Sequence, residues 1–250
     1  MTWRVFAASA IGKYHIDTGI PCQDAFAFRV VGDGFVGVVC DGAGSAVHSE
    51  IGATECAQVV VESIAAAIGE CGADQVSAAC SREYLESVVE SARARLQGIA
   101  GERRFEFRDL SCTLVGCLAT PHGGCLFHIG DGMAVVESSG QPPIISLPEN
   151  GEYANETYFV TADDWRARLR ITPLPPVESG CVALMSDGAA PFVINREKSG
   201  LFRPFIDPVN SYLLSVSEAD GSNALRETLA DEKTYSITGD DKTLLIALAV

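Results

Sequence analysis

The order of the hydrophobic patterns is the feature of this sequence that most constrains its fold. Short apolar runs typical of β-strands open the chain, fill its middle and close it, and residues with helical spacing fall between these blocks. A doubly wound parallel sheet requires strands and helices that alternate regularly, and this sequence lacks that alternation. Blocks of strands with helices gathered between them favour an α+β fold, in which helices cover antiparallel sheets.

The individual elements follow from the same periodicities. The predicted strands are residues 3–10, 25–31, 35–40, 111–119, 124–129, 133–138, 158–162, 181–185 and 243–250. The predicted helices are residues 47–68, 85–99, 201–216 and 223–229, and residues 141–155 are predicted to be mostly loop. Because no stretch resembles an interdomain linker, residues 1–250 are predicted to form a single domain.

Composition narrows the class of partner. Hydrophobic residues make up 47% of the chain, which is enough for a large buried core, and the formal net charge is −15. Repulsion from phosphate groups therefore disfavours nucleic acid and anionic membrane surfaces as partners. No window of about 20 uninterrupted apolar residues occurs, and the N-terminal apolar run is predicted to be a strand rather than a signal peptide.

The cysteines indicate the compartment. There are nine, an odd number scattered along the chain, and none forms a C-x-x-C pair. A zinc site is therefore not indicated, and a reducing compartment is favoured over an oxidising one. We expect a cytoplasmic protein whose cysteines act mainly as small apolar residues.

Aspartates recur where apolar runs begin or end, and several are followed directly by glycine. They are Asp24, Asp41, Asp131, Asp187, Asp240 and Asp241. A single Asp-Gly pair is usually only a turn, so the argument depends on the repetition. If these strand ends converge, the carboxylates repel one another unless a divalent cation neutralises them, and hard oxygen ligands suit Mg²⁺ or Mn²⁺. A pair of such ions can activate a water and hold a phosphate group.

Five short motifs resemble the metal-dependent Ser/Thr phosphatases of the protein phosphatase 2C (PPM) family. They are QDA at 23–25, CDGAGS at 40–45, GDG at 130–132, SDG at 186–188 and DDKT at 240–243, in the family's order along essentially the whole chain. The resemblance implies a four-layer α-β-β-α sandwich, with two antiparallel sheets flanked by helices. It also implies metal-dependent hydrolysis of phosphoserine and phosphothreonine in proteins by metal-activated water, with a Ser/Thr kinase or its targets as partners.

The resemblance also assigns metal ligands to two ions, Mn²⁺ or Mg²⁺, with a third in many members. Asp41 would bridge two metals, and the Gly42 carbonyl would add a ligand. Asp187 and Asp240 would complete the shell of the first metal. Asp24 would act through water on the second metal, and Asp131 would hold a third with Asp187.

Three positions depart from the family pattern, and the segment from His15 to Asp24, H-x5-P-C-Q-D, instead resembles a divergent bacterial branch of the family. Gln23 replaces a common acidic residue, Gly19 stands where many members have a phosphate-binding Arg, and Ala43 stands where some have a His. We hypothesise that His15 or Lys13 supplies the missing phosphate contact or the proton for the leaving group. His15 therefore joins Asp41 and Asp187 as a candidate catalytic residue.

Two other functions stay open at this point. The departures at Gln23 and Gly19 are compatible with a non-catalytic pseudophosphatase that binds a partner, although retained buried carboxylates without a metal would be costly. A phosphatase of a small phosphorylated metabolite is the second alternative. Activity on phosphopeptides compared with small phosphoesters separates the latter from a protein phosphatase.

Overall fold

Two five-stranded antiparallel sheets form the centre of the molecule. The computed structural model describes residues 1–69, 72–148 and 157–250. The first sheet has the order β1 (Trp3–Ala10), β10 (Lys242–Ala249), β9 (Gly180–Met185), β6 (Met133–Ser138) and β7 (Ile144–Ser146). The second has the order β2 (Ala25–Val31), β3 (Gly34–Cys40), β4 (Leu114–Thr120), β5 (Gly123–Ile129) and β8 (Arg170–Leu174).

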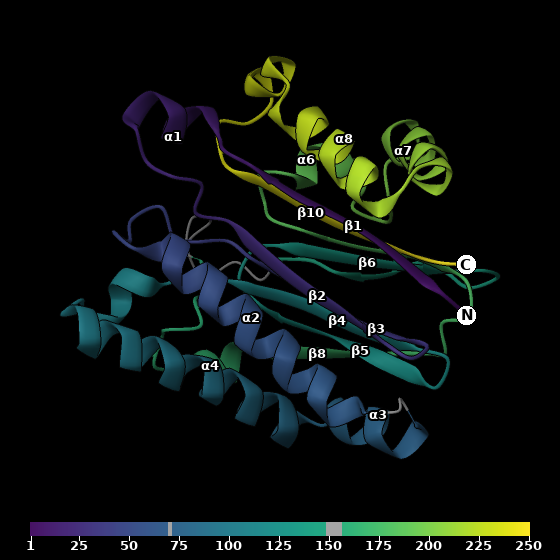
Figure 1. The fold of residues 1–250 in the computed structure, drawn as a ribbon, viewed down its shortest axis with the longest axis horizontal. Coiled ribbons are helices and arrows are strands. Elements are labelled where there is room, and N and C mark those ends of the chain that lie inside the picture. The colour runs from purple at the N-terminus through teal and green to yellow at the C-terminus, as the bar shows by residue number, and fades with distance from the viewer. Residues whose placement is uncertain (70–71, 149–156) are drawn as a thin grey trace.

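Helices cover the outer face of each sheet, as Figure 1 shows. The second sheet is covered by α2 (Ser49–Ile68), α3 (Ala73–Ala79) and α4 (Arg82–Arg103), and the first by α7 (Arg203–Ser215) and α8 (Glu218–Ala230). The short elements are α1 (Lys13–Thr18), α5 (Trp165–Arg168), α6 (Ala190–Val193), and the 3₁₀ turns η1 (Phe107–Leu110) and η2 (Glu232–Ser236). The four-layer α-β-β-α sandwich is therefore confirmed.

The core lies in three layers that follow from this stacking. Phe35, Val115 and Leu245 belong to the layer between the two sheets and are fully buried. α2 is long and apolar enough to cross a membrane by length and composition, but its buried face packs on the second sheet and α4. Since that face contributes to the core of the sandwich, its apolar composition has a structural cause.

One predicted strand is wrong, and several short elements were not predicted. Residues 158–162 form no strand, although the Val160 N–H donates to the Cys112 carbonyl. The guanidinium of Arg93 on α4 instead takes the carbonyls of Val160 and Ala162, which are then unavailable to a sheet. Strands β7 and β8 and helices α1 and α3 were missed because they are short and weakly patterned. Of the predicted loop 141–155, residues 144–146 form β7 and residues 149–155 lie outside the described part of the chain.

The strand directions bring distant segments to one end of the sandwich. β3, β5 and β9 end, and β10 begins, at the end where α1 lies (Figure 1). The two termini lie at the opposite end, where Thr2 and Val250 exchange two backbone hydrogen bonds of 2.8 and 3.0 Å. The residues after β3, β5 and β9 and before β10 therefore meet.

Candidate active site

An acidic pocket of about 210 Å³ opens at this end. Its wall contains four of the predicted metal ligands together with one recurring aspartate to which the family resemblance assigned no role. These are Asp41, Asp131, Asp187, Asp240 and Asp241. His15 and Gly42 also line the pocket, so it gathers residues from both sheets and from α1.

Backbone hydrogen bonds fix the turn that follows β3. The Asp41 N–H donates to Thr113 Oγ1 at 3.0 Å, and the Thr113 N–H donates back to the Asp41 carbonyl at 2.8 Å. The Gly42 N–H donates to the Gln23 carbonyl at 3.1 Å. A Cβ on Gly42 would lie 2.6 Å from that same carbonyl oxygen and 2.8 Å from Ser49, so only glycine fits.

Asp131 and Asp187 follow strands of different sheets, β5 and β9. Gly130, at φ +111°, turns the chain after β5, and Asp131 Oδ2 accepts a 2.7 Å hydrogen bond from the Thr157 hydroxyl. Asp131 Oδ1 is buried and has no hydrogen-bond partner among the described residues. Burial raises the pKa of Asp187, and the nearby Asp131 and Asp240 carboxylates raise it further.

The adjacent residues Asp240 and Asp241 have different roles. Asp240 is exposed at the mouth of the pocket, whereas the Asp241 side chain is only 5% exposed. Asp241 Oδ1 accepts the Gly12 N–H at 2.6 Å, and Oδ2 accepts the Gln23 N–H at 2.6 Å. These bonds hold α1 and the segment before β2 against the start of β10. The sequence shows two adjacent aspartates, but no local pattern tells which one lines the pocket as an exposed carboxylate and which one is buried and holds α1.

His15 hydrogen-bonds to Asp241 and faces the pocket. Its Nδ1 lies 2.9 Å from Asp241 Oδ2, and because a carboxylate only accepts, Nδ1 carries the hydrogen. Lys13, the other candidate, is exposed, forms an ion pair with Asp17 and does not line the pocket. Gly19 ends α1 in the left-handed conformation at φ +70° and offers no side chain. Among the described residues, no lysine or arginine lines the pocket.

Asp24 lies behind the pocket wall rather than in it. It is 8% exposed, and its Oδ2 accepts a 2.7 Å hydrogen bond from the Ser186 hydroxyl, whose oxygen in turn accepts the Thr243 N–H at 2.9 Å. Burial raises the pKa of Asp24 to about 7. Asp24 Oδ1 is buried with no partner among the described residues. This carboxylate therefore buttresses the wall from within.

The charges in the pocket fit a divalent cation. Burial raises the pKa of Asp41, and the carboxylates of Asp24, Asp187 and Asp131 raise it further. Like charges at this density destabilise one another unless a cation lies between them. The donors are carboxylate oxygens, one of them an orphaned buried atom of Asp131, together with backbone oxygens. Such a donor set matches Mg²⁺ or Mn²⁺.

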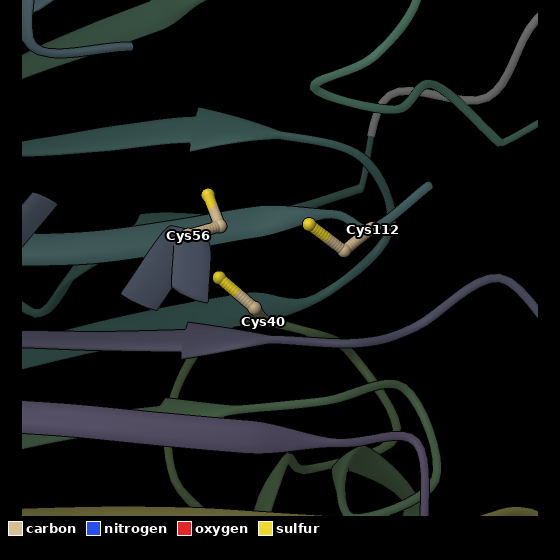
Figure 2. A group of neighbouring side chains, drawn as sticks. All are labelled: Cys40, Cys56 and Cys112. Carbon is tan, nitrogen blue, oxygen red and sulfur yellow. The ribbon is translucent and has the colours of Figure 1, made fainter. Parts of the chain in front are cut away.

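Three thiols pack together directly behind Asp41. Figure 2 shows the side chains of Cys40, Cys56 and Cys112 gathered together. Cys40 ends β3, Cys56 lies on α2, and Cys112 forms an isolated β-bridge with Gly42. Their Sγ atoms lie within 4.8 Å of one another. All three are fully buried, and burial raises the pKa of the Cys40 thiol. The cluster joins α2 to the base of the Asp41 turn as an apolar contact. No sequence motif indicated it, because the three cysteines come from separate elements.

The comparisons with known proteins agree with this geometry. The family model described as Protein phosphatase 2C matches residues 11–230, well over half of the sequence. The chain belongs to the protein phosphatase 2C family. It is therefore an enzyme of the protein-serine/threonine phosphatase class, and the family is metal-dependent.

Known relatives extend over the whole chain. Serine/threonine-protein phosphatase 3 of Escherichia coli (strain K12) is 30% identical over 258 residues, covering 99% of each chain. A crystal structure of a bacterial serine phosphatase has a TM-score of 0.66 at 14% identity, covering 100% of this chain and 98% of that one. RsbX in complex with magnesium has a TM-score of 0.56 at 12% identity, covering 98% and 94%. These two structural likenesses show the fold alone.

Proposed function

We propose that residues 1–250 act as one catalytic domain that hydrolyses phosphoserine and phosphothreonine in proteins with Mn²⁺ or Mg²⁺ as cofactor. The observation that carries the proposal is the convergence of Asp41, Asp131, Asp187 and Asp240 on one pocket from three strand ends and one strand start. A pocket with so many carboxylates suits a cation-bound phosphate and repels a bare one.

The residues proposed to hold the ions are those that the family resemblance assigns, and the lining of the pocket supports this assignment. Asp41 and the Gly42 carbonyl would hold the ions together with Asp187 and Asp240, and all four residues line the pocket. Asp131 with Asp187 would hold a third ion, and Asp24, behind the wall, would act through water. The cations supply positive charge for the phosphate and lower the pKa of a bound water.

His15 is proposed to give a proton to the leaving alkoxide of the substrate. Asp241 fixes its Nδ1–H, so Nε2 is the nitrogen that is free to face the pocket. This geometry is typical of a histidine that is oriented by a carboxylate for acid–base work. Asp241 is thus a positioning residue. Of the two candidate proton donors, His15 is favoured because Lys13 lies at the surface outside the pocket.

The proposed substrate is a phosphorylated protein, with a Ser/Thr kinase or its targets as the partner and the cytoplasm as the location. The printed name of the Escherichia coli relative, a serine/threonine-protein phosphatase, supports a protein substrate. The net charge of −15 supports the exclusion of nucleic acid and anionic membranes as partners. A small phosphorylated metabolite remains the second candidate, because the pocket of about 210 Å³ would also admit one.

The deciding experiment measures hydrolysis of p-nitrophenyl phosphate and of a phosphothreonine peptide, with and without Mn²⁺, by the wild type and Asp187→Asn. We expect metal-dependent turnover of both substrates by the wild type and a loss of at least about 100-fold in the variant. Turnover of p-nitrophenyl phosphate alone would favour the metabolite phosphatase. No turnover of either substrate at any Mn²⁺ or Mg²⁺ concentration would favour a pseudophosphatase that binds its partner without reaction.

A further inference from the structure

A second pocket adjoins the acidic one and has a different character. It measures about 350 Å³ and shares Asp187 with the acidic pocket. Buried apolar residues, among them Met133, Ala190 and Ile194, line its interior. A chain whose phosphorylated residue occupies the acidic pocket would pass this second pocket with its neighbouring residues.

Two positively charged residues line this second pocket. The side chains of Arg196 and Lys198 line it and are exposed, and no described residue forms an ion pair or a side-chain hydrogen bond with either. Glu197, which lies between them in sequence, does not line the pocket. In a chain with a net charge of −15, and beside a pocket lined by no lysine or arginine of the described residues, this is a local reversal of charge.

Lys198 stands in a conformation that its residue type disfavours. Its φ is +52°, in the left-handed region that glycine adopts with little cost. The turn around it is rigid: the Lys198 N–H donates to the Asn195 carbonyl at 3.0 Å, and the Ser199 N–H donates to Asn195 Oδ1 at 2.9 Å. The bridge between Ile194 and Leu201 closes the turn. The backbone here favours glycine, so the lysine side chain is a candidate for a role of its own.

We propose that Arg196 and Lys198 form a recognition surface for acidic side chains that flank the phosphorylated residue of a protein substrate. The acidic head of such a residue would meet the two cations, and its aliphatic stem or an apolar neighbour would lie on the Met133–Ala190–Ile194 surface. Charge complementarity then directs an acidic phosphoprotein to a site whose own wall is acidic. This inference rests on the proposed function, because it names the class of protein substrate for that site.

The test compares two phosphothreonine peptides that are identical except for glutamate or glutamine at the positions flanking the phosphothreonine. We expect the wild type to favour the glutamate peptide by about five- to tenfold in kcat/KM, mainly through KM and less at high salt. The double variant Arg196→Gln/Lys198→Gly should bring that ratio to about one. Arg226→Gln, which removes an exposed cation on α8, is the matched control and should keep the full ratio.

Lys198→Gly alone separates recognition from folding. Glycine relieves the positive φ, so the melting temperature should stay the same or rise while the peptide preference falls. A structural role for Lys198 would instead lower the melting temperature. Equal kcat/KM for both peptides in the wild type, or an unchanged preference in the double variant, would overturn the proposal.

The same peptides distinguish failure of this inference from failure of the proposed function. p-Nitrophenyl phosphate has no flanking residues and reports the phosphatase centre alone. If no substrate is hydrolysed, the proposed function fails, and the recognition surface is then decided by fluorescence anisotropy of the labelled peptides with Mn²⁺ present. Tighter binding of the glutamate peptide that is lost in the double variant supports it, and equal binding overturns it.

Discussion

Asp241 shows what a single side chain does in this site. One carboxylate accepts the N–H of Gly12, the N–H of Gln23 and the His15 ring, and all three partners lie more than 200 residues earlier in the sequence. The sequence places Asp240 and Asp241 together before the last strand, and the family pattern selected Asp240. Because the partners of Asp241 are distant in sequence, its role became visible only in the folded chain.

His15→Ala tests the proposed proton donor. The phosphothreonine alkoxide needs a proton to leave, whereas p-nitrophenolate leaves readily without one. We expect kcat for the phosphothreonine peptide to fall by about 100-fold and kcat for p-nitrophenyl phosphate to change far less. Lys13→Ala, on the same helix, is the control and should leave both rates unchanged. Equal losses for both substrates in His15→Ala would argue for a phosphate contact instead.

His128 gives the molecule a pH-dependent element of stability. Its Nδ1 lies 2.8 Å from Ser146 Oγ and 2.8 Å from Arg170 Nη2, so it joins β5, β7 and β8. Burial, together with the nearby Arg170 charge, lowers the pKa of His128 to about 3. Below about pH 6.5 the His128 imidazole is therefore protonated in the unfolded chain and stays neutral in the folded chain. Stability from this group is present above about pH 6.5 and declines as the pH falls toward 3.

Urea unfolding at pH 7.5 and 5.5 measures this contribution. The wild type should lose about 1 kcal/mol more on acidification than His128→Gln does. The carboxylates of the acidic pocket titrate in both proteins, so the difference between the two pH dependences isolates His128. Parallel pH dependences would show that the ring is protonated in the folded protein.

Among the secondary-structure elements, prediction succeeded where the apolar pattern is long. The runs that became β3, β5, β9 and β10 are nearly continuous, and their ends were correctly placed next to the aspartates. The segment 158–162 has a similar apolar pattern, but the guanidinium of Arg93 on α4 donates hydrogen bonds to its carbonyls, and no strand forms there. β8, with only five residues and a proline, has too little pattern to recognise. Tertiary hydrogen bonds decided these cases, and local pattern does not report them.

Arg93 is the element-scale link between α4 and the pocket. Its bonds to Val160 and Ala162 hold the segment that carries Thr157 and Phe159, both of which line the pocket. Arg93→Met keeps the apolar volume but removes the guanidinium donor from one buried carbonyl, that of Val160, and from one half-buried carbonyl, that of Ala162. We expect a loss of about 1–3 kcal/mol in the free energy of unfolding and a raised KM.

Arg95→Met is the matched control for that variant. Arg95 lies on the same helix, and among the described residues it forms an ion pair only with Glu55 at the surface, where its side chain is 52% exposed. Its loss should leave the free energy of unfolding nearly unchanged, because solvent screens an exposed ion pair. Urea unfolding and peptide kinetics on the two variants give the comparison, and equal effects would remove the assigned role of Arg93.

At the scale of the whole molecule, repulsion among the pocket carboxylates and the net charge of −15 both destabilise the folded state. A cation that binds the folded protein and not the unfolded chain stabilises it by mass action. Millimolar Mn²⁺ should therefore raise the melting temperature by several degrees, and a chelator should reverse the shift. Asp187→Asn should respond much less. A shift of equal size in wild type and variant would place the bound cation elsewhere.

The chemistry of the site was more accessible to sequence reasoning than its selectivity. Five short motifs led to the family, because each is visible in the local sequence and together they follow the family's order. Arg196 and Lys198 carry no such motif. Their position depends on how the turn after α6 folds beside Asp187, which is a property of the assembled sheets.

The paired termini have a practical consequence. Thr2 and Val250 lie at the far end of the sandwich from the pocket, separated from it by the length of the eight-residue strand β10. At about 3.3 Å per residue this amounts to about 26 Å. A fused module or a surface tether at either end would leave the pocket unobstructed. A tethered substrate, in contrast, needs a linker long enough to travel around the edge of the sandwich before its phosphate can enter.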